Sequence, residues 1–227
     1  AIATALHSAG AKIAFCATSQ ASVDKALAAY AEEGITDVKG WPCDVTDEAQ
    51  VKELVATIEK EVGVIDILVN NAGIIKRTPM CEMDVADFRR VIDVDLVAPF
   101  ICAKAVLPGM MERNRGKIIN VCSILSELGR ETVTQSICAE FADKNIQCNG
   151  LGPGYIATQQ TAPLREPQAD GSRHPFYQFI IGRTPAARWG LSEDLMGPAV
   201  FLASEASDFV NGQILYADGG LLSYLGK

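Results

Sequence analysis

Ser123 is the residue of this chain whose setting most suggests catalysis, because it directly follows the largely apolar run KIINVC at residues 117–122. A serine hydroxyl at the end of a buried strand can donate a hydrogen bond to a carbonyl oxygen, but it scarcely ionises near neutral pH. A reaction at that carbonyl therefore needs a separate proton source within reach. Residues 119–141 around the serine contain no tyrosine, histidine or lysine, so this stretch does not supply that group.

Three other segments place glycine or polar side chains where an apolar run ends: residues 43–47 (CDVTD), 70–73 (NNAG) and 153–158 (PGYIAT). Side-chain amides in such turns brace the neighbouring backbone, and glycine lets a ligand approach the main chain closely. Alone, NNAG is equally consistent with an ordinary turn. If the apolar runs are parallel strands, all four ends meet at one edge of a sheet, where open α/β sheets bind ligands.

The elements that must position these residues follow from the alternation of strand-like and helix-like periodicity, which predicts one α/β domain over residues 1–227. Apolar runs predict strands at KIAFCAT, DVKGWPC, VIDILVNNAG, KIINVCS, IQCNGLGPG and QILYADGG. Between them, helical spacing of apolar residues predicts helices at residues 2–10, 22–34, 48–62, 84–113, 134–145 and 192–204. The predicted fold class is a doubly wound parallel sheet, Rossmann-like, with three α/β/α layers. The strand around Ile67 is apolar enough to be central and buried on both faces.

Residues 159–188 interrupt this alternation. The segment is rich in proline, charged and aromatic side chains, and it is long for a connection inside one domain. Long irregular insertions of this kind often cover a binding site. We therefore predict a lid-like insertion here.

Composition and charge narrow the classes of function. The chain has 227 residues, of which 48% are hydrophobic, and a formal net charge of −8 with a pI near 4.8. Nucleic acids and anionic membranes would repel such a surface. No apolar run approaches the roughly 18 residues of a membrane span, and the first residues lack the cationic start of a signal peptide. We expect a cytoplasmic protein whose partner is a small molecule.

The cysteine pattern argues against a disulfide framework and against a zinc site. The seven cysteines are an odd number, scattered, and without a C-x-x-C pair, whereas both kinds of site require regular spacing. We expect these side chains to be small buried hydrophobic groups. No metal site is predicted.

Taken in this order, the motifs at residues 43–47, 70–73, 120–123 and 153–158 resemble those of the short-chain dehydrogenase/reductase family, and the likeness covers essentially the whole chain. The resemblance implies hydride exchange between a nicotinamide cofactor and a carbonyl or secondary alcohol, with Ser123 polarising the substrate carbonyl. It also implies that the cofactor is held by Asp44 and Val45 at the adenine, by Asn71, Ala72 and Gly73 at the ribose, and by Pro153, Gly154, Ile156 and Thr158 at the nicotinamide.

The proton donor that the resemblance implies is absent from the sequence. The family uses a tyrosine followed four residues later by a lysine, whose charge lowers the phenol's pKa from about 10. Ser136 stands at the tyrosine's position, and none of the five tyrosines has a lysine four residues on. The helix is also shorter than the family's, so we predict that a segment carrying the pair is missing between Val133 and Thr134. The family's first strand and glycine-rich, pyrophosphate-binding turn would likewise precede Ala1.

A protein of another class would explain the missing acid differently. A non-catalytic dinucleotide-binding or sensor protein could keep the fold and lose the proton donor. Such a protein would bind nucleotide without turnover, and its polypeptide would be contiguous across Val133 and Thr134.

Asp95 departs from the family pattern, which usually has an asparagine that holds a water of the proton relay at this position. An ionised aspartate accepts hydrogen bonds but cannot donate them. Two interpretations remain: Asp95 is a member of the relay with Ser123, or it is an acid that caps or packs in its helix.

The end of the second strand of this family selects between the two nicotinamide cofactors. An acidic residue there binds the ribose 2′-OH of NAD and repels a 2′-phosphate. This chain has Ala17, Thr18, Ser19 and Gln20, without an acid or an arginine. The prediction is NADP, with NAD also accommodated, and with Thr18 and Ser19 as donors to the 2′-phosphate.

The segments SELGRETV, GYIATQQTAPLRE, GSRHPF and TPAARWG resemble the gluconate 5-dehydrogenase branch of the family, which interconverts gluconate and 5-ketogluconate. A sugar acid is anionic, so its site needs a cation. Lys76, Arg77 and Arg130 are the predicted substrate-binding residues, with Arg173 and His174 as further candidates, although each is also consistent with an ordinary surface charge. A 2-dehydro-3-deoxy-gluconate and a 3-ketoacyl thioester are alternative substrates. A homo-oligomer, a tetramer by family analogy, is expected.

Overall fold

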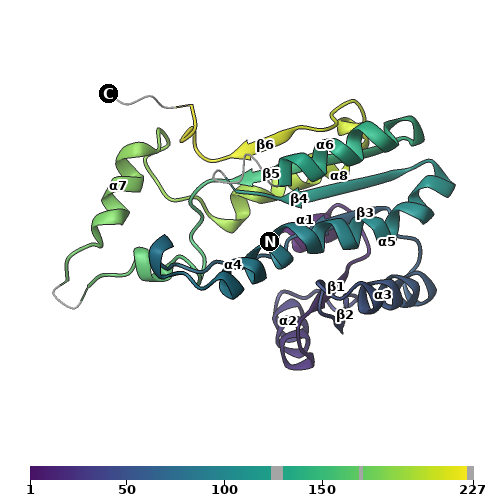
Figure 1. Ribbon diagram of the computed structural model, residues 1–227, viewed down its shortest axis with the longest axis horizontal. Coiled ribbons are helices and arrows are strands. Elements are labelled where there is room, and N and C mark those ends of the chain that lie inside the picture. The colour runs from purple at the N-terminus through teal and green to yellow at the C-terminus, as the bar shows by residue number, and fades with distance from the viewer. Residues whose placement is uncertain (124–129, 169–170, 224–227) are drawn as a thin grey trace.

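The strands of the chain are parallel to their neighbours and form two sheets. The computed structural model describes residues 1–123, 130–168 and 171–223, apart from the side chains of Met80 and of residues 130–132. The smaller sheet pairs β1 (Ala14–Ala17) with β2 (Lys39–Pro42). The larger sheet has the order β3 (Ile67–Asn70), β4 (Gly116–Val121), β5 (Ile146–Pro153) and β6 (Ile214–Ala217) (Figure 1). The predicted α/β class of parallel strands and flanking helices is confirmed, but the expected single sheet is divided between β1 and β3.

The division leaves one edge of β3 unpaired. Residues of a parallel strand turn their N–H and C=O groups alternately to its two neighbours. The carbonyl of Asp66 accepts from the Lys117 N–H at 2.9 Å, so Ile67 and Val69 face the opposite edge. No strand in the described part of the chain pairs there, and Ile67, Leu68 and Val69 are only half-buried. The expectation of a central strand buried on both faces is therefore wrong.

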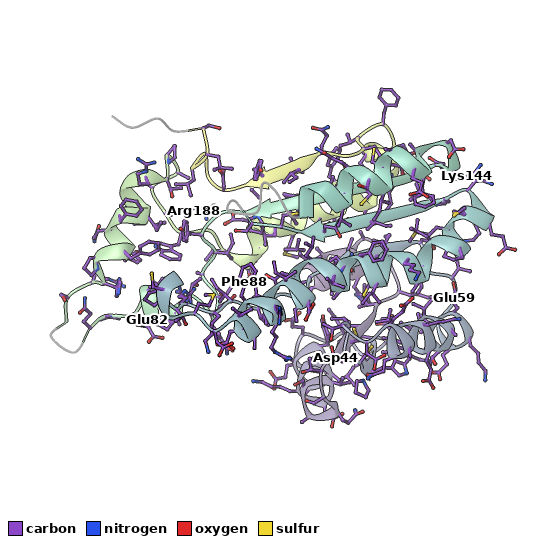
Figure 2. All side chains as sticks on the ribbon, in the orientation of Figure 1. Asp44, Glu59, Glu82, Phe88, Lys144 and Arg188 are labelled. Atoms are coloured by element: carbon purple, nitrogen blue, oxygen red, sulfur yellow. The ribbon has the colours of Figure 1, made fainter. Side chains whose placement is uncertain are left out.

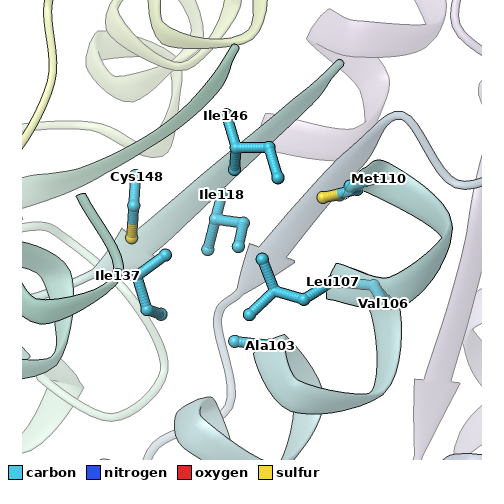
Figure 3. Close-up of a cluster of buried hydrophobic side chains, with 8 residues drawn as sticks. All are labelled: Ala103, Val106, Leu107, Met110, Ile118, Ile137, Ile146 and Cys148. Atoms are coloured by element: carbon cyan, nitrogen blue, oxygen red, sulfur yellow. The ribbon is translucent and has the colours of Figure 1, made fainter. Parts of the chain in front are cut away.

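Helices cover both faces of the larger sheet and confirm the three layers. On one face, α5 (Ala98–Arg113) and α6 (Arg130–Phe141) pack on β4 and β5 through the cluster of Figure 3: Ala103, Val106, Leu107, Met110, Ile118, Ile137, Ile146 and Cys148. On the other face, α8 (Met196–Ala203) buries Ala199 and Leu202 against Ile119 and Leu151. α1 (Ile2–Ser8) packs beside α8. Successive residues of β4 thus point into opposite cores, as strand geometry requires.

Side-chain caps determine where three helices begin. Asp47 Oδ1 accepts from the N–H groups of Ala49 and Gln50 at 2.9 and 3.1 Å and starts α3 (Glu48–Glu61), close to the predicted residues 48–62. Asp84 Oδ1 accepts from the Ala86 N–H at 2.7 Å and starts α4 (Val85–Ile92). Ser19 caps α2 (Gln20–Glu32), which therefore begins earlier than the predicted residue 22. Each cap satisfies backbone N–H groups that a first turn leaves unpaired.

The segment at residues 159–188 is more ordered than its sequence suggested. It contains a short 3₁₀ turn, Ala162–Leu164, and a helix that the sequence analysis missed, α7 (Pro175–Arg183). His174 Nδ1 caps α7 by accepting from the Phe176 N–H at 3.1 Å. Figure 1 shows α7 to one side of the sheets. Proline and charged residues near its start obscured the short apolar pattern of this helix. Its Tyr177 packs on a local aromatic cluster around Trp189 rather than on the main sheet.

The cysteines only partly match the expectation of buried hydrophobic groups. None of the seven, all of which lie in the described residues, forms a disulfide bond. Cys43, Cys122 and Cys148 are buried as expected, whereas Cys16 and Cys81 are exposed, which contradicts it. Burial raises the pKa of Cys148 to about 12 and, with nearby acidic groups, that of Cys43 to about 11. Thiols with such pKa values stay protonated and are poor nucleophiles.

Candidate functional site

The predicted cofactor residues and the predicted catalytic Ser123 lie at or just after the carboxyl ends of the strands. Thr18 and Ser19 follow β1, Asp44 and Val45 follow β2, Asn71, Ala72 and Gly73 follow β3, Ser123 follows β4, and Pro153 ends β5. The strand register aligns these ends, since Ala17 is opposite Pro42 and Asn70 is opposite Asn120. The two sheets thus supply two parts of one predicted rim: β1 and β2 carry the adenine side, and β3, β4 and β5 carry the reaction side.

A buried polar network lies beneath the reaction side. Asn70 Nδ2 donates to Asn120 Oδ1 at 2.8 Å, and Asn120 Nδ2 donates to Thr134 Oγ1 at 2.9 Å. Asn120 and Thr134 are 1% and 0% exposed. The network joins the ends of β3 and β4 to α6 directly below Asn71 and Ser123. The sequence did not single out Asn120 or Thr134 as members of a network. An asparagine inside an apolar strand is nevertheless a signal for a buried amide that needs hydrogen-bond partners.

Asp95 holds the backbone that follows NNAG. It lies in a π-helical turn, Asp93–Val97, between α4 and α5, and its Oδ1 accepts from the Ile74 N–H at 2.8 Å. π-helical turns are rare in proteins overall, and those that occur are often found at functional sites. By accepting this hydrogen bond, the Asp95 carboxylate fixes the position of the backbone that follows NNAG. Membership of a proton relay stays a prediction.

Asp44 presents a fixed carboxylate at the adenine side of the rim. Its Oδ1 accepts from the Thr46 hydroxyl at 2.7 Å and from the Thr46 N–H at 3.0 Å. These hydrogen bonds hold the pKa of Asp44 below its usual value, because they favour the charged form. An exposed carboxylate that stays ionised can accept a hydrogen bond from an amino group such as that of adenine.

The end of β1 fits a phosphate group. Ser19 Oγ accepts from the Ser22 N–H at 3.3 Å and lies 3.0 Å from Ser22 Oγ, at the N-terminus of the 13-residue helix α2. Thr18 is exposed beside it. A helix N-terminus carries partial positive charge and favours anions. The residues present therefore suit a 2′-phosphate better than a bare ribose 2′-OH.

The turn after β5 is rigid and tightly packed. A Cβ at Gly154 would come within 2.7 Å of the Asp218 Cα, so the turn requires glycine. The Ala157 N–H donates to the Gly190 carbonyl at 2.8 Å and buries Ile156 beside it. Thr158 is exposed at the end of the turn.

A hollow of about 290 Å³ adjoins the back of this turn, between the ends of β5 and β6. Its lining includes Gly154 and Ile156 of the predicted nicotinamide turn, together with Thr184 and Arg188. Among the described residues the lining includes neither Ser123 nor Asp44, and Figure 2 shows Arg188 and Asp44 well apart. Arg188 donates to both carboxylate oxygens of Asp194, at 2.6 and 2.8 Å, and lowers the pKa of Asp194 to about 2. The hollow therefore borders the predicted nicotinamide turn without reaching Ser123, and Arg188, a cation in its lining, is already paired with Asp194.

The cations predicted to bind a carboxylate differ in how they are engaged. Lys76 Nζ lies 3.0 Å from Asp87 Oδ2. Arg173 lies 4.9 Å from the Tyr177 ring centroid and donates to the Arg165 carbonyl. The Arg130 side chain lies outside the described residues. Arg77 is exposed and has no ion-pair partner within the described chain. Its charge is therefore the most available of these candidates for pairing with a substrate carboxylate.

No tyrosine replaces the missing proton donor at its expected position. α6 runs without a break across Val133 and Thr134. Ser136 is exposed, whereas Thr134 and Ile137 on the same helix are buried toward β4 and β5. Tyr155 packs edge-on against Trp189, with ring centroids 5.6 Å apart.

The described residues contain no group of three or more histidine, cysteine, aspartate or glutamate side chains arranged to hold a metal ion. Within the same ranges, no helix has both the length and the apolar character needed to cross a membrane.

Comparisons with known proteins agree with the geometry. Residues 1–222 match the family model described as enoyl-(acyl carrier protein) reductase. A 2-dehydro-3-deoxy-D-gluconate 5-dehydrogenase of Formosa agariphila is 54% identical over 223 residues, covering 92% of this chain and 82% of the relative. The crystal structure of 2-keto-3-deoxy-D-gluconate dehydrogenase from Streptococcus agalactiae superimposes with a TM-score of 0.87 at 59% identity, covering 100% of this chain and 90% of that chain.

A second solved structure, at lower identity, contains ligands. It is a gluconate 5-dehydrogenase from Burkholderia cenocepacia in complex with NADP and tartrate, with a TM-score of 0.88 at 38% identity, covering 99% of this chain and 90% of that chain. The family match spans nearly the whole chain, and the fold of these relatives is the fold described above. The chain therefore belongs to the short-chain dehydrogenase/reductase family, whose oxidoreductases use NAD(P), and its relatives act on gluconate-type sugar acids.

Proposed function

We propose that this chain binds NADP along the rim of strand ends and belongs to an enzyme that exchanges hydride with 2-dehydro-3-deoxy-gluconate. The choice of substrate rests on the sequence identity of this chain to relatives named for different sugar acids. Two relatives named for 2-dehydro-3-deoxy- or 2-keto-3-deoxy-gluconate reach 54% and 59%, and others named for the first of these lie at 39–43%. A 5-keto-D-gluconate 5-reductase reaches 42%, and gluconate 5-dehydrogenases reach 38–39%. Gluconate and 5-ketogluconate, which the sequence motifs favour, are the second candidate pair.

The chain's own residues supply binding and orientation. Asp44 and Val45 would hold the adenine, Asn71, Ala72 and Gly73 the ribose, Thr18 and Ser19 the 2′-phosphate, and Pro153, Gly154, Ile156 and Thr158 the nicotinamide side. When bound, NADP supplies the hydride acceptor. Ser123 would donate a hydrogen bond to the reacting oxygen of the substrate, and Arg77 would pair with its carboxylate.

The step that this sequence does not support is proton transfer. Oxidation of an alcohol releases the hydroxyl proton to a base, and a serine hydroxyl is a poor base at neutral pH. We infer that the tyrosine and lysine belong to a segment missing between Val133 and Thr134. The alignment with the F. agariphila relative supports this, since 92% of the 227 residues is about 209, fewer than the 223 aligned positions. That relative therefore has residues inside the alignment without a counterpart here.

The substrate is tested on a chimaera in which the corresponding segment of the F. agariphila relative is inserted between Val133 and Thr134. Nicotinamide absorbance is followed with 2-dehydro-3-deoxy-gluconate, gluconate, 5-ketogluconate and a 3-ketoacyl thioester. We expect the highest kcat/KM with the deoxy acid, and a fall in kcat on the order of 10²-fold or more in the Ser123→Ala chimaera. A preference for gluconate would reverse the order of candidates. Activity with the thioester alone would refute a sugar-acid substrate.

The inference about the missing segment is tested on the protein isolated from its natural source. Trypsin should not release residues 131–144 of that protein as one contiguous peptide, which mass spectrometry checks; a contiguous peptide would favour the non-catalytic alternative. A chain made to this sequence, without the segment, is expected to bind NADP in calorimetry and to leave the nicotinamide absorbance unchanged with every substrate of the panel. Turnover by the contiguous chain would contradict the inference. Binding without turnover in the chimaera as well would favour the non-catalytic, nucleotide-sensing alternative.

A further inference from the structure

Two side chains that follow the turn after β5 hold the backbone of Thr158 by both of its polar groups. The Thr158 N–H donates to Thr161 Oγ1 at 3.0 Å, and the Thr158 carbonyl accepts from Arg165 Nη2 at 2.8 Å. Thr161 and Arg165 are half-buried, whereas Thr158 is exposed. The backbone of Thr158 is therefore fixed on both sides of the residue, although its side chain is open to a ligand.

The Thr161 hydroxyl lies at the centre of these contacts. It donates to the Ile156 carbonyl at 2.8 Å, with the Thr158 carbonyl at 3.1 Å as a longer alternative acceptor. It accepts from the Thr158 N–H and, at 3.3 Å, from Arg165 Nε. A hydroxyl has one proton to donate and two lone pairs, so these contacts use its full capacity. Thr161 thus fastens residues 156–158 to Arg165.

Arg165 is itself held in place from other sides. Its guanidinium lies over the ring of Trp189, 5.9 Å from the centroid, and Trp189 is 7% exposed. Its carbonyl accepts from Arg173 Nη1 at 3.1 Å. A planar guanidinium can donate to two acceptors while it lies against an aromatic ring, which the ammonium of a lysine does not reproduce. Arg165 is therefore a fixed pair of donors and not a freely moving surface charge.

We propose that Arg165 and Thr161 are positioning residues for the nicotinamide half of the cofactor and that they act through Thr158. This inference rests on the proposed function, which places Thr158 beside the nicotinamide. The two side chains fix the Thr158 backbone before the cofactor arrives, so that less conformational freedom is lost when the ring binds. The adenine half of the cofactor, at the ends of β1 and β2, does not depend on these contacts.

Calorimetry with two nucleotides tests the proposal on a chain made to this sequence. NADPH contains the nicotinamide, whereas 2′-phospho-ADP-ribose has the same adenine half without it. Arg165→Met and Thr161→Val are each expected to raise the dissociation constant of NADPH about fivefold, and that of 2′-phospho-ADP-ribose by less than about twofold. Far-UV circular dichroism checks folding, and either variant serves if the other does not fold.

Two further variants are the controls. Thr161→Ser keeps the hydroxyl and should therefore retain the parent affinity for NADPH. Arg183→Met removes an exposed arginine at the end of α7, in the same insertion, and should change neither dissociation constant.

Amide exchange of Thr158, measured by nuclear magnetic resonance, gives a readout that needs no nucleotide. Thr161→Val removes the acceptor of this N–H, so the amide should exchange at least about tenfold faster than in the parent chain. Thr161→Ser should keep the parent rate.

The outcomes separate this inference from the proposed function. A parent chain that binds neither nucleotide would refute the proposed function and the inference with it. If the parent binds both nucleotides and the variants weaken the two equally, or weaken neither, the positioning role is overturned while the proposed function stands. Equal exchange of the Thr158 amide in Thr161→Val and Thr161→Ser would also overturn it, because the hydroxyl would then not hold this backbone.

Discussion

Asn120 shows how a single buried amide connects the parts of this rim. It accepts from Asn70 and donates to Thr134, so that one side chain joins β3, β4 and α6. Buried amides are costly when a partner is lost, because the remaining group cannot return to water. The network is therefore expected to fix the relative positions of Asn71 and Ser123, which follow these strands.

Thr134→Val should destabilise the chain, because it removes the hydroxyl that accepts from Asn120 Nδ2 while keeping the side-chain shape. Asn120 Nδ2 keeps its contact with Cys148 Sγ at 3.6 Å, but losing the Thr134 acceptor is expected to lower the free energy of unfolding by about 1–3 kcal/mol. Urea denaturation followed by circular dichroism measures the change. Ser136→Ala, at an exposed position of the same helix, should stay within about 0.5 kcal/mol of the parent chain. Equal losses in the two variants would show that the network contributes no stability.

At the scale of elements, α3 depends on a charged cap. Asp47 accepts from the Gln50 N–H and side chain and from the Ala49 N–H. These hydrogen bonds hold the pKa of the Asp47 carboxyl below its usual value. A group with a depressed folded-state pKa contributes stability above its unfolded pKa, and the contribution is lost as pH falls through the folded value.

Asp47→Ala is therefore expected to lower the midpoint of thermal unfolding at pH 7. The difference from the parent chain should shrink as the pH falls below about 4, where the carboxyl begins to protonate. Differential scanning calorimetry at several pH values measures it. Glu53→Ala, an exposed acid in the middle of the same helix, is the control and should show a small difference. A loss from Asp47→Ala that is the same at pH 2.5 and pH 7 would argue against the charged cap.

Local elements were predictable because their signals lie in neighbouring residues. The helical spacing of apolar residues predicted α3 and the region of α4 and α5, and the apolar run at residues 146–151 predicted β5. α7 was missed because proline and charged residues at its start outweighed a short apolar pattern. The strand ends placed Ser123 and Asn71 on one rim, but the Asn120 to Thr134 contact joins residues whose spacing carries no periodic signal.

The division of the sheet was not predictable from periodicity, which reports whether a segment is a strand and not what lies beside it. The run around Ile67 has the composition of a central strand, yet pairing across its outer edge needs another strand that the described chain does not provide there. Likewise, the apolar spacing of Val85 and Phe88 predicts a helix but does not tell whether its own chain covers that face.

At the scale of the molecule, the unpaired edges should be visible in hydrogen exchange. Ala14 and Cys16 on β1 and Ile67 on β3 have backbone groups directed away from their paired neighbours, since the intervening residues make the ladder bonds. Their amides are expected to exchange at least tenfold faster than the amide of Ile119, in the buried strand β4. Exchange measured by nuclear magnetic resonance tests this. Comparable protection of Ile67 and Ile119 would mean that the edge is covered in solution.

The separation of the two sheets has a consequence for ligand capture. Among the residues that the structure describes, no ladder of backbone hydrogen bonds joins the two sheets, and the smaller sheet is attached to the larger one through helices, loops and side chains. That sheet carries Thr18, Ser19 and Asp44. A nucleotide bound along the whole rim would contact both sheets and so restrict the motion of the smaller sheet relative to the larger one. When the nucleotide dissociates, the smaller sheet would regain that motion while the core of the larger sheet stays packed.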